Sequence, residues 1–334
     1  MDFGPRTWRG YWQFAATAAA ALGLSLGAQG VLADVLRLGV QDAAVPFAYR
    51  TADGRAVGYT VEICQLIADR LARERGRPVE LQYVSVTSKT RLVMLLAGQT
   101  DLDCGSTSAT DGRRQLRLEF SRPIFVSDVA VLLPRAAGVP DSAAQWLRDA
   151  AQARLPVVTT AGSTSVRHLA ALRDQMPGGQ ALRVEYGVDH DDSMRRLLDG
   201  RASAFVMDRV LLAARLTWAT GGSGRGRAGW EIAPWSVAPQ SLECYAVAMR
   251  ERDTELKRVA DAAIGELLQG GAFGVLYARW FQQPIAPPQA VVGLQGQADA
   301  RSLDLPLPAG LRERLAEPGG ADCASGRANA GAPR

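Results

Sequence analysis

The sequence predicts an α/β protein of two lobes with a ligand cleft between them. Strand-like and helix-like runs alternate along the chain in two separate series, a rhythm typical of sheets layered by helices. An extended run at 123–134 leaves the first series and an apolar run at 244–250 follows the second, so we expect the chain to cross between two sheets twice. The chain has 334 residues, 47% of them hydrophobic, and is long enough to bury two cores.

The first series opens with an apolar run that is expected to form a strand. Ile63, Cys64 and Ile67 then recur on one helical face, and 79–86 alternates in the manner of a half-buried strand. The predicted elements are a strand at 35–40, a helix at 59–76, a strand at 79–86 and a helix at 88–99.

The second series repeats this rhythm after the extended run. Its predicted elements are strands at 156–160, 182–186 and 202–208 and helices at 165–175, 193–200 and 210–219. A glycine-rich loop at 221–229 separates it from the strand at 244–250, and helices are expected at 255–269 and 273–281.

These patterns give an expected division of the chain into four parts. The parts are a signal peptide at 1–33, a first lobe at 34–133 plus 243–300, a second lobe at 134–242 and a C-terminal extension at 301–334. The extension is rich in Pro, Gly and Ala, and we expect it to be disordered from about residue 317.

The N-terminal segment has the composition of an export signal. Arg6 and Arg9 give it a positive start, 15–28 is an apolar stretch too short to span a bilayer comfortably, and small residues lead up to Ala33. We therefore expect cleavage near Ala33 and a periplasmic mature protein that begins at Asp34. An uncleaved membrane anchor is the alternative.

Charge and cysteine content exclude several classes of function. The net charge is +4, only two residues are lysine, and no basic run stands out, so nucleic acid is not an expected partner. Four cysteines without a CxxC pair, together with only two histidines, argue against a zinc site, and no cofactor is expected. In an exported protein the cysteines can pair in three ways; we favour Cys104 with Cys244 and expect Cys64 simply to be buried.

A hydroxyl-rich segment, 101–114, follows the first helical region. The stretch CGSTS comes directly after a strand candidate at 101–103, and Arg113 lies behind it. Such a segment can be a turn with a helix cap. It can also be a cup for a small anion, because hydroxyls and amides then stand in front of a forked cation.

The second series carries matching polar groups at the ends of its strands. TTAGSTS at 159–165 opens a helix, so its free amides and the hydroxyls of Thr160 and Thr164 face outward, and Asp208 ends another strand. Taken singly, the hydroxyls and Asp208 are ordinary helix caps, and Arg113 is one member of a surface ion pair. Taken together, they supply a fork for an α-carboxylate and a carboxylate with hydroxyls for an ammonium, as a free amino acid requires.

Four stretches carry a resemblance to a known family. They are FAYRTADGRAVGYTVEICQLIADRL, VTSKTRLVMLLAGQTDLDCGSTSATDGRRQ, TTAGSTSVRHL and DHDDSMRRLLDGRASAFVMDRVLLA. The chain resembles the bacterial extracellular solute-binding family 3, most closely its periplasmic glutamate/aspartate-binding branch, from about Val35 to about Pro318. The resemblance implies the type II periplasmic-binding-protein fold, with two crossover strands and lobes that close over an amino acid. It also implies a monomer that hands its ligand to the membrane permease of an ABC importer.

The resemblance also assigns roles to individual residues. The α-carboxylate group would be held by Arg113, Ser108 and the Thr164 amide, and the ammonium by Ser106 and Asp208. Positions that surround the ligand's side chain in the acidic-amino-acid branch are matched by Ser88, Arg91, Thr160 and His190.

One position departs from that branch. Gln41 stands where the branch usually has an arginine, so one cation that would hold a side-chain carboxylate is missing. Arg91 and His190 still favour an acidic ligand, while Gln41 leaves glutamine, asparagine or another polar amino acid as the alternative. We expect no enzyme, although a dehydratase-like activity on the same fold is a second alternative. That activity would need a general acid or base from carboxylates such as Glu62 or Glu243.

Overall fold

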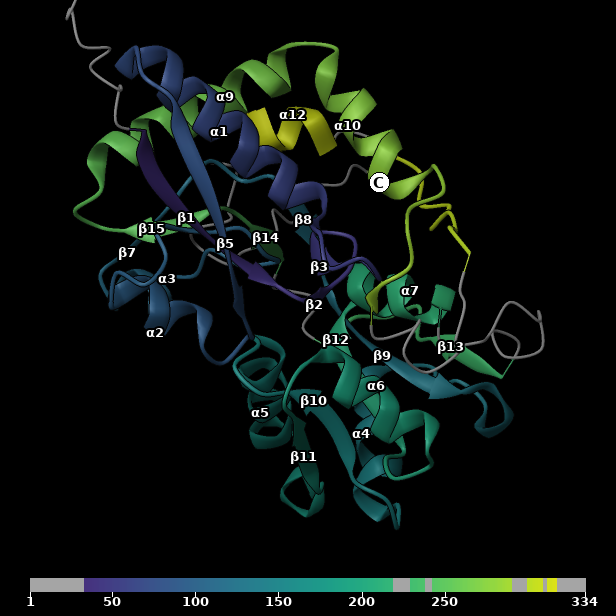
Figure 1. The fold of residues 1–334 in the computed structure, drawn as a ribbon. Coiled ribbons are helices and arrows are strands. Elements are labelled where there is room, and N and C mark those ends of the chain that lie inside the picture. Colours follow the sequence, from purple (N-terminus) through teal and green to yellow (C-terminus); the bar gives the residue numbers. More distant parts are fainter. Residues whose placement is uncertain (1–32, 219–228, 238–241, 290–298, 309–310, 317–334) are drawn as a thin grey trace, which may run out of the picture.

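A computed structural model describes residues 33–218, 229–237, 242–289, 299–308 and 311–316. In this part of the chain, two five-stranded sheets with helices against them form two lobes (Figure 1). The predicted two-lobed α/β fold is therefore confirmed. The expected signal peptide lies outside the described residues except for Ala33, and so does the tail from residue 317.

The first lobe is built on a mixed sheet. Its strands, in spatial order, are β5 (Val79–Val86), β1 (Asp34–Gln41), β6 (Leu102–Asp103), β15 (Ala248–Arg250) and β7 (Leu118–Phe120). β1 runs parallel to β5 and β6, whereas β15 is antiparallel to β6 and β7. The parallel strands therefore end at one edge, where the chain continues into β2 and into the CGSTS segment.

Helices and a small sheet complete this lobe. They are α1 (Tyr59–Arg75), α2 (Arg91–Leu96), α3 (Asp111–Arg114), α9 (Thr254–Gln269), α10 (Ala272–Phe281), α12 (Leu311–Ala316) and the antiparallel strands β2 (Ala43–Ala44), β3 (Ala48–Arg50) and β4 (Ala56–Val57). The face of α1 that carries Ile63, Cys64, Ile67 and Leu71 is buried, as its spacing predicts.

The second lobe has the same kind of sheet. Its strands are β11 (Val184–Gly187), β10 (Val157–Thr160), β12 (Ala204–Asp208), β9 (Val129–Pro134) and β13 (Trp230–Ile232), and its helices are α4 (Ala143–Gln152), α5 (Ser165–Gln175), α6 (His190–Leu198) and α7 (Arg209–Trp218). Two short 3₁₀ turns lie at Arg135–Ala137 and Gly179–Ala181. β10 runs parallel to β11 and β12, so these strands also end at a common edge.

Two antiparallel strands join the lobes, β8 (Phe125–Ser127) and β14 (Glu243–Tyr245). The predicted strand at 244–250 is therefore two strands, because β14 belongs to the crossing and β15 to the first sheet. β9 already pairs with β12, which places the first crossing a few residues before the expected boundary at 133/134. The division into lobes at 133/134 and 242/243 remains a proposal.

Aromatic side chains pack around the crossing strands. The Phe47 ring meets Tyr245 at a centroid distance of 4.9 Å and Phe125 at 5.0 Å, and Phe125 stacks on Phe281 at 5.1 Å. Each such contact stabilises the fold by about 0.5–1.5 kcal/mol, in addition to the effect of the apolar surface that it buries. They anchor β8 and β14 to the first lobe.

The described part of the C-terminal extension packs on the first lobe, and it also touches the second lobe, where Arg301 Nη1 donates to the Thr217 carbonyl oxygen of α7 at 2.8 Å. Leu303, Leu311 and Leu315 are buried in the core that also holds α9 and α10. Among the described helices, none by itself is long and apolar enough to cross a membrane; α9 and α10 reach that threshold only as a pair bent by 90°.

The disulfide differs from the favoured pairing. Cys104 is bonded to Cys64 on α1, 40 residues away, and not to Cys244, which is itself in a disulfide. Cys64 is fully buried, as expected, but it is also a cross-link. The bond holds the first residue of the CGSTS segment against the N-terminal half of α1.

Loss of the Cys64–Cys104 bond is expected to lower the free energy of unfolding by about 4 kcal/mol, because the unfolded chain regains the freedom of a 40-residue loop. Denaturant unfolding of the Cys64→Ala/Cys104→Ala double variant measures this. A midpoint equal to that of the wild type would show that the bond contributes nothing to stability.

Candidate functional site

The strand ends of the two lobes face each other across the lobe boundary. The first lobe contributes the segments after β5 and β6, and the second lobe contributes the ends of β10 and β12 and the first residues of α5 and α6. None of the nine side chains predicted for the site is more than 8% exposed: Ser88, Arg91, Ser106, Ser108, Arg113, Thr160, Thr164, His190 and Asp208. Because these polar side chains are buried close together, they need hydrogen-bond partners, and most have a partner on the other side of the lobe boundary.

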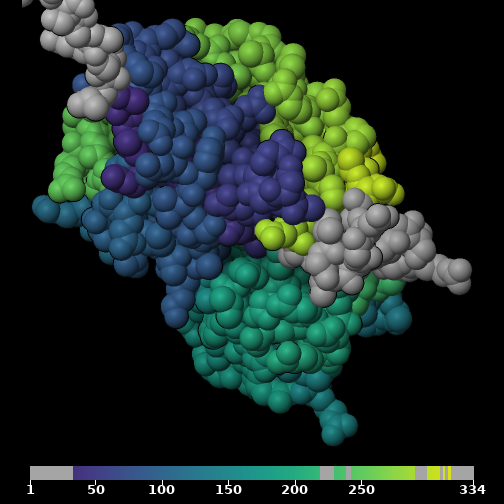
Figure 2. Space-filling model, in the orientation of Figure 1, coloured from purple at the N-terminus to yellow at the C-terminus, as the bar shows by residue number. Residues whose placement is uncertain are grey.

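The lobes are in contact in this structure, and Figure 2 shows their surfaces meeting along one seam. Arg113 of the first lobe donates from Nη2 to the carbonyl oxygen of Gly162 in the second, at 3.5 Å. Gly162 has a φ of +79°, and a Cβ there would lie 2.5 Å from the Ser88 carbonyl oxygen. A residue without a side chain therefore permits this close approach of the two backbones.

Arg113 is a buried cation at the edge of the first lobe. The Thr110 hydroxyl caps the short helix α3 that carries it, and Nη1 donates to the Ser108 carbonyl oxygen at 2.7 Å. Burial, and then the nearby Arg91, lower the pKa of Arg113 to about 9, so it keeps its charge at pH 7. Within the described residues it forms no ion pair, which leaves the guanidinium fork able to take an anion.

Asp208 ends β12 in the opposing lobe and is equally buried. The Tyr245 hydroxyl donates to Oδ2, and Ser165 donates to Oδ1 at 3.3 Å. Burial, and then the nearby Glu243, raise the pKa of Asp208 to about 8. This carboxyl therefore needs a cation before it carries a full charge at neutral pH.

Glu243 and His168 lie among the candidate site residues, although neither is one of the ligand-binding residues that the sequence predicts. Glu243 starts β14 and accepts hydrogen bonds from Thr164 Oγ1 at 2.8 Å and His168 Nε2 at 2.7 Å, both in the second lobe. Burial opposes its charge, but the hydrogen bonds from His168 and Ser108 outweigh it and hold the pKa of Glu243 below its usual value. The only sequence signal for Glu243 was its place at the second crossing, where a side chain can reach both lobes.

Gln41 is buried where the two lobes meet. It is the last residue of β1, is 2% exposed, and contacts both Arg91 and Ser88. Its Oε1 lies 3.0 Å from the Ser106 backbone nitrogen. The position that departs from the acidic branch is therefore part of the polar cluster around the predicted side-chain residues.

His190 begins α6 and reaches the first lobe. Its Nε2 lies 3.5 Å from Ser88 Oγ, and its Nδ1 lies 2.9 Å from Thr160 Oγ1. Burial, and then the positive charges of Arg215 and Arg91, hold the pKa of His190 well below 6.5. His190 is therefore a neutral ring with a hydroxyl at each nitrogen.

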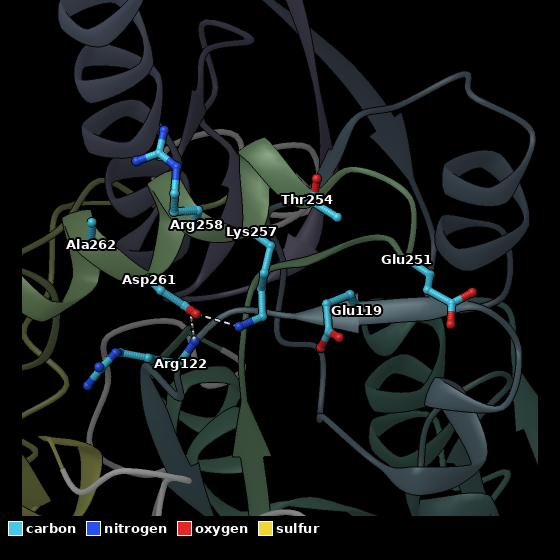
Figure 3. Close-up of a pocket in the computed structure, with 8 residues that line it drawn as sticks. All are labelled: Glu119, Arg122, Glu251, Thr254, Lys257, Arg258, Asp261 and Ala262. Carbon is cyan, nitrogen blue, oxygen red and sulfur yellow. Dashed lines mark hydrogen bonds and ion pairs between the residues drawn. The ribbon is translucent and has the colours of Figure 1, made fainter.

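Two of the cavities bordered by described residues bear on the search for a ligand site. One, of about 150 Å³, opens between the lobes and is lined by residues that include Gln41, Ser88 and His190. The other, of about 530 Å³, is an outer groove beside α9 in which Lys257 and Arg122 both bond to Asp261 (Figure 3). That groove contains none of the predicted site residues, whereas two of them, Ser88 and His190, line the cavity between the lobes, so this cavity is the better candidate for a ligand site. Arg113 and Asp208 are buried at the same boundary but do not line the cavity.

Two lobes joined by two strands, with polar strand ends buried where they meet, define a two-lobed solute-binding protein. Residues 36–283 match the model of the bacterial extracellular solute-binding proteins, family 3. The chain belongs to this family, as its resemblance implied.

Relatives within the family agree with the predicted branch. The chain is 30% identical to the L-glutamate/L-aspartate-binding protein of Pseudomonas aeruginosa, over 85% of each chain. It is 31% identical to the glutamate/aspartate import solute-binding protein of Escherichia coli, over 76% of this chain and 78% of that one. The glutamine-binding protein of a Bacillus subtilis ABC transporter is 22% identical, over 70% of this chain and 75% of that one.

Solved structures share the fold at lower identity. An ancestral arginine-binding protein bound to glutamine gives a TM-score of 0.61 at 21% identity, covering 75% of this chain and all of the other. An ancestral amino-acid-binding protein, described as a precursor of cyclohexadienyl dehydratase, gives 0.61 at 18% identity, covering 74% of this chain and 96% of that one.

Proposed function

We propose that the protein is the substrate-binding component of an ABC importer and that it binds an α-amino acid between its lobes. The observation that carries the proposal is that Arg113 in one lobe and Asp208 in the other are both buried where the lobes meet. A zwitterion carries a carboxylate for Arg113 and an ammonium for Asp208, and both side chains can contact it only when the lobes are closed.

The backbone groups of an amino acid find natural partners here. Its α-carboxylate would take the Arg113 fork, the free amide of Thr164 at the start of α5 and the Ser108 hydroxyl, which would turn to the ligand from Glu243. Its ammonium would take Asp208 and Ser106. Glu243 would position Thr164 and His168, since its carboxylate already accepts a hydrogen bond from each of them.

An acidic side chain is the first expectation for the ligand. The relatives of about 30% identity are named for glutamate and aspartate, and Arg91 lies buried among Ser88, Gln41 and Ser106. Thr160 and His190 would close this subsite from the second lobe. The same proposal includes export to the periplasm, delivery of the ligand to membrane permease subunits and a monomeric state.

Glutamine and asparagine form a second candidate, favoured by the neutral Gln41. A dehydratase-like enzyme has less support. Asp208, a carboxyl that is protonated near neutral pH, is already required by the ligand's ammonium, and the relatives are named as binding proteins.

Thermal melting in the presence of each common amino acid tests the proposed function. Binding to the native state adds about 2.7 kcal/mol at a hundredfold excess over Kd, so the true ligand should raise Tm clearly. Chromatography of the mixture should return the ligand unchanged. No shift with any amino acid would contradict the proposal, and a converted ligand would favour the enzyme.

Binding is expected to release a proton near neutral pH. The pKa of Asp208, about 8, lies above pH 7, so its carboxyl is mostly protonated before the ammonium arrives and ionised afterwards. Affinity should therefore rise with pH up to about 8 and fall by up to about tenfold per unit below it. Calorimetry at pH 7 in phosphate and in Tris should give different heats for the wild type. It should give equal heats for Asp208→Asn when this variant is titrated to saturation at the higher ligand concentrations that its weaker binding requires. Equal wild-type heats, with a constant Kd from pH 6 to 8, would contradict this.

A further inference from the structure

Gln41 has its oxygen and nitrogen fixed by its neighbours. Arg91 Nη1 lies 2.7 Å from one end of the carboxamide, and the Ser106 backbone nitrogen lies 3.0 Å from the same end. Both of these groups can only donate, so the atom that faces them is the oxygen. The amide nitrogen is then directed to Ser88 Oγ, 3.0 Å away, and to the cavity that Ser88 and His190 also line.

The positive charge of Arg91 lies beside one buried carboxyl on the protein side. Its Nη1 is engaged by Gln41, and its Nε lies 3.8 Å from the carboxyl of Asp103, which is 1% exposed. Burial raises the pKa of Asp103, and Arg91 partly offsets this effect. A carboxylate on the ligand would therefore meet a single cation, Arg91, whose charge Asp103 offsets only in part, since Gln41 is neutral. A neutral carboxamide would leave Arg91 with the Asp103 carboxyl and Gln41 Oε1 as its partners.

The second lobe contributes a ring whose hydrogen-bonding direction can reverse. His190 Nδ1 faces Thr160 Oγ1 at 2.9 Å, and that hydroxyl faces Ser193 Oγ at 2.9 Å. Each hydroxyl can donate or accept by rotation. The neutral ring can thus carry its proton on Nδ1 and accept at Nε2, or carry it on Nε2 and donate there.

We propose that the side-chain subsite formed by Gln41, Arg91 and His190 accepts a side-chain carboxylate and the corresponding carboxamide with similar affinity. The ligand class is then the acidic amino acids together with their amides. This inference rests on the proposed function, because it takes the α-carboxylate and ammonium to be held by Arg113 and Asp208.

Each side-chain group finds a complete set of partners. A carboxylate accepts from Gln41 Nε2, from Arg91 and from His190 when the ring carries its proton on Nε2. A carboxamide places its oxygen toward the same donors on the first lobe and donates its N–H to His190 Nε2 when the proton is on Nδ1. No charged group has to move in either case, because only a ring proton and one or two hydroxyls change direction.

Calorimetric titration of the wild type with glutamate, glutamine, aspartate and asparagine tests the proposal. The acid and the amide of the better-binding chain length should have Kd values within about tenfold of each other. A larger difference in either direction overturns the proposal. If one of the other amino acids binds and these four do not, the side-chain assignment fails while the zwitterion site stands. If no amino acid binds, the proposed function itself fails.

Gln41→Arg identifies the determinant. The added cation should raise the ratio of acid to amide affinity at least tenfold, because only the carboxylate gains a charged partner. Gln152→Arg is the matched control, since it adds the same charge at an exposed residue that ends α4. A ratio that stays at the wild-type value in Gln41→Arg, or that moves equally in both variants, contradicts a role for Gln41.

The tautomer of His190 gives a readout independent of affinity. The chain has only two histidines, so ¹⁵N NMR signals can be assigned by comparison with His168→Gln. His190 should carry its proton on Nε2 with the bound acid and on Nδ1 with the bound amide. The same tautomer in both complexes would contradict the reversal mechanism.

Discussion

Replacing Arg113 by alanine is expected to weaken amino-acid binding at least a hundredfold. Arg113 is 8% exposed and, among the described residues, has no carboxylate within ion-pair distance, so the ligand's α-carboxylate would be its main anionic partner. Without the guanidinium, that carboxylate would be buried with only hydroxyl and amide donors, which costs several kcal/mol. Arg113→Lys should recover part of the loss, since it restores a charge but not the planar fork.

Arg114→Ala is the control for Arg113. Arg114 neighbours it on α3 but pairs with Glu119 at the half-exposed surface, so its loss should leave affinity near the wild-type value. Calorimetry measures all three variants, and thermal melting confirms that each is folded. A Kd for Arg113→Ala within about threefold of wild type would remove Arg113 from the ligand site.

Gly162→Ala is expected to prevent full closure and to weaken binding by a comparable factor. Its Cβ would lie 2.5 Å from the Ser88 carbonyl oxygen and 2.7 Å from Lys89 Cα, both in the backbone of the other lobe. Side-chain rotation cannot relieve contacts with backbone, so the lobes must stay apart. The separated lobes avoid this clash, and folding should lose only the cost of a left-handed alanine, about 1 kcal/mol.

Gly178→Ala is the control that separates the steric clash between the lobes from the cost of an alanine in the left-handed conformation. Gly178 lies in the same lobe with a φ of +78°, nearly that of Gly162, but no atom lies within 4 Å of its Cβ position. It should lose about the same stability as Gly162→Ala and bind like the wild type. Small-angle scattering at saturating ligand should show a smaller radius for the wild type and Gly178→Ala only. A full decrease in radius for Gly162→Ala would contradict contact-limited closure.

Local patterns in the sequence predicted most of the architecture. The strand at 79–86 and the helix at 165–175 have the predicted bounds, because alternating and helical spacings reflect which side of each element is buried. The run at 244–250 predicts a single strand because it is apolar up to Met249. Periodicity does not reveal that such a run leaves one sheet at Tyr245 and enters another at Ala248.

The parts of the site that the sequence missed depend on contacts between distant segments. Cys64 meets Cys104, and Glu243 meets His168, only because the fold brings their elements together, and neither spacing nor composition contains that information. Gln41 was identified as a departure from the acidic branch, but its hold on Arg91 and on the Ser106 amide required the structure.

The proposed cleft binds the α-carboxylate and the α-ammonium of a free amino acid together. Calorimetric titration of the wild-type protein with the preferred amino acid, its N-acetyl derivative and its α-amide measures what each of these two groups contributes. The free amino acid is expected to bind, and each blocked derivative to bind at least a hundredfold more weakly, because Asp208 or Arg113 is left without its charge partner. Binding of either blocked derivative within about threefold of the free amino acid would show that Arg113 and Asp208 do not hold a zwitterion.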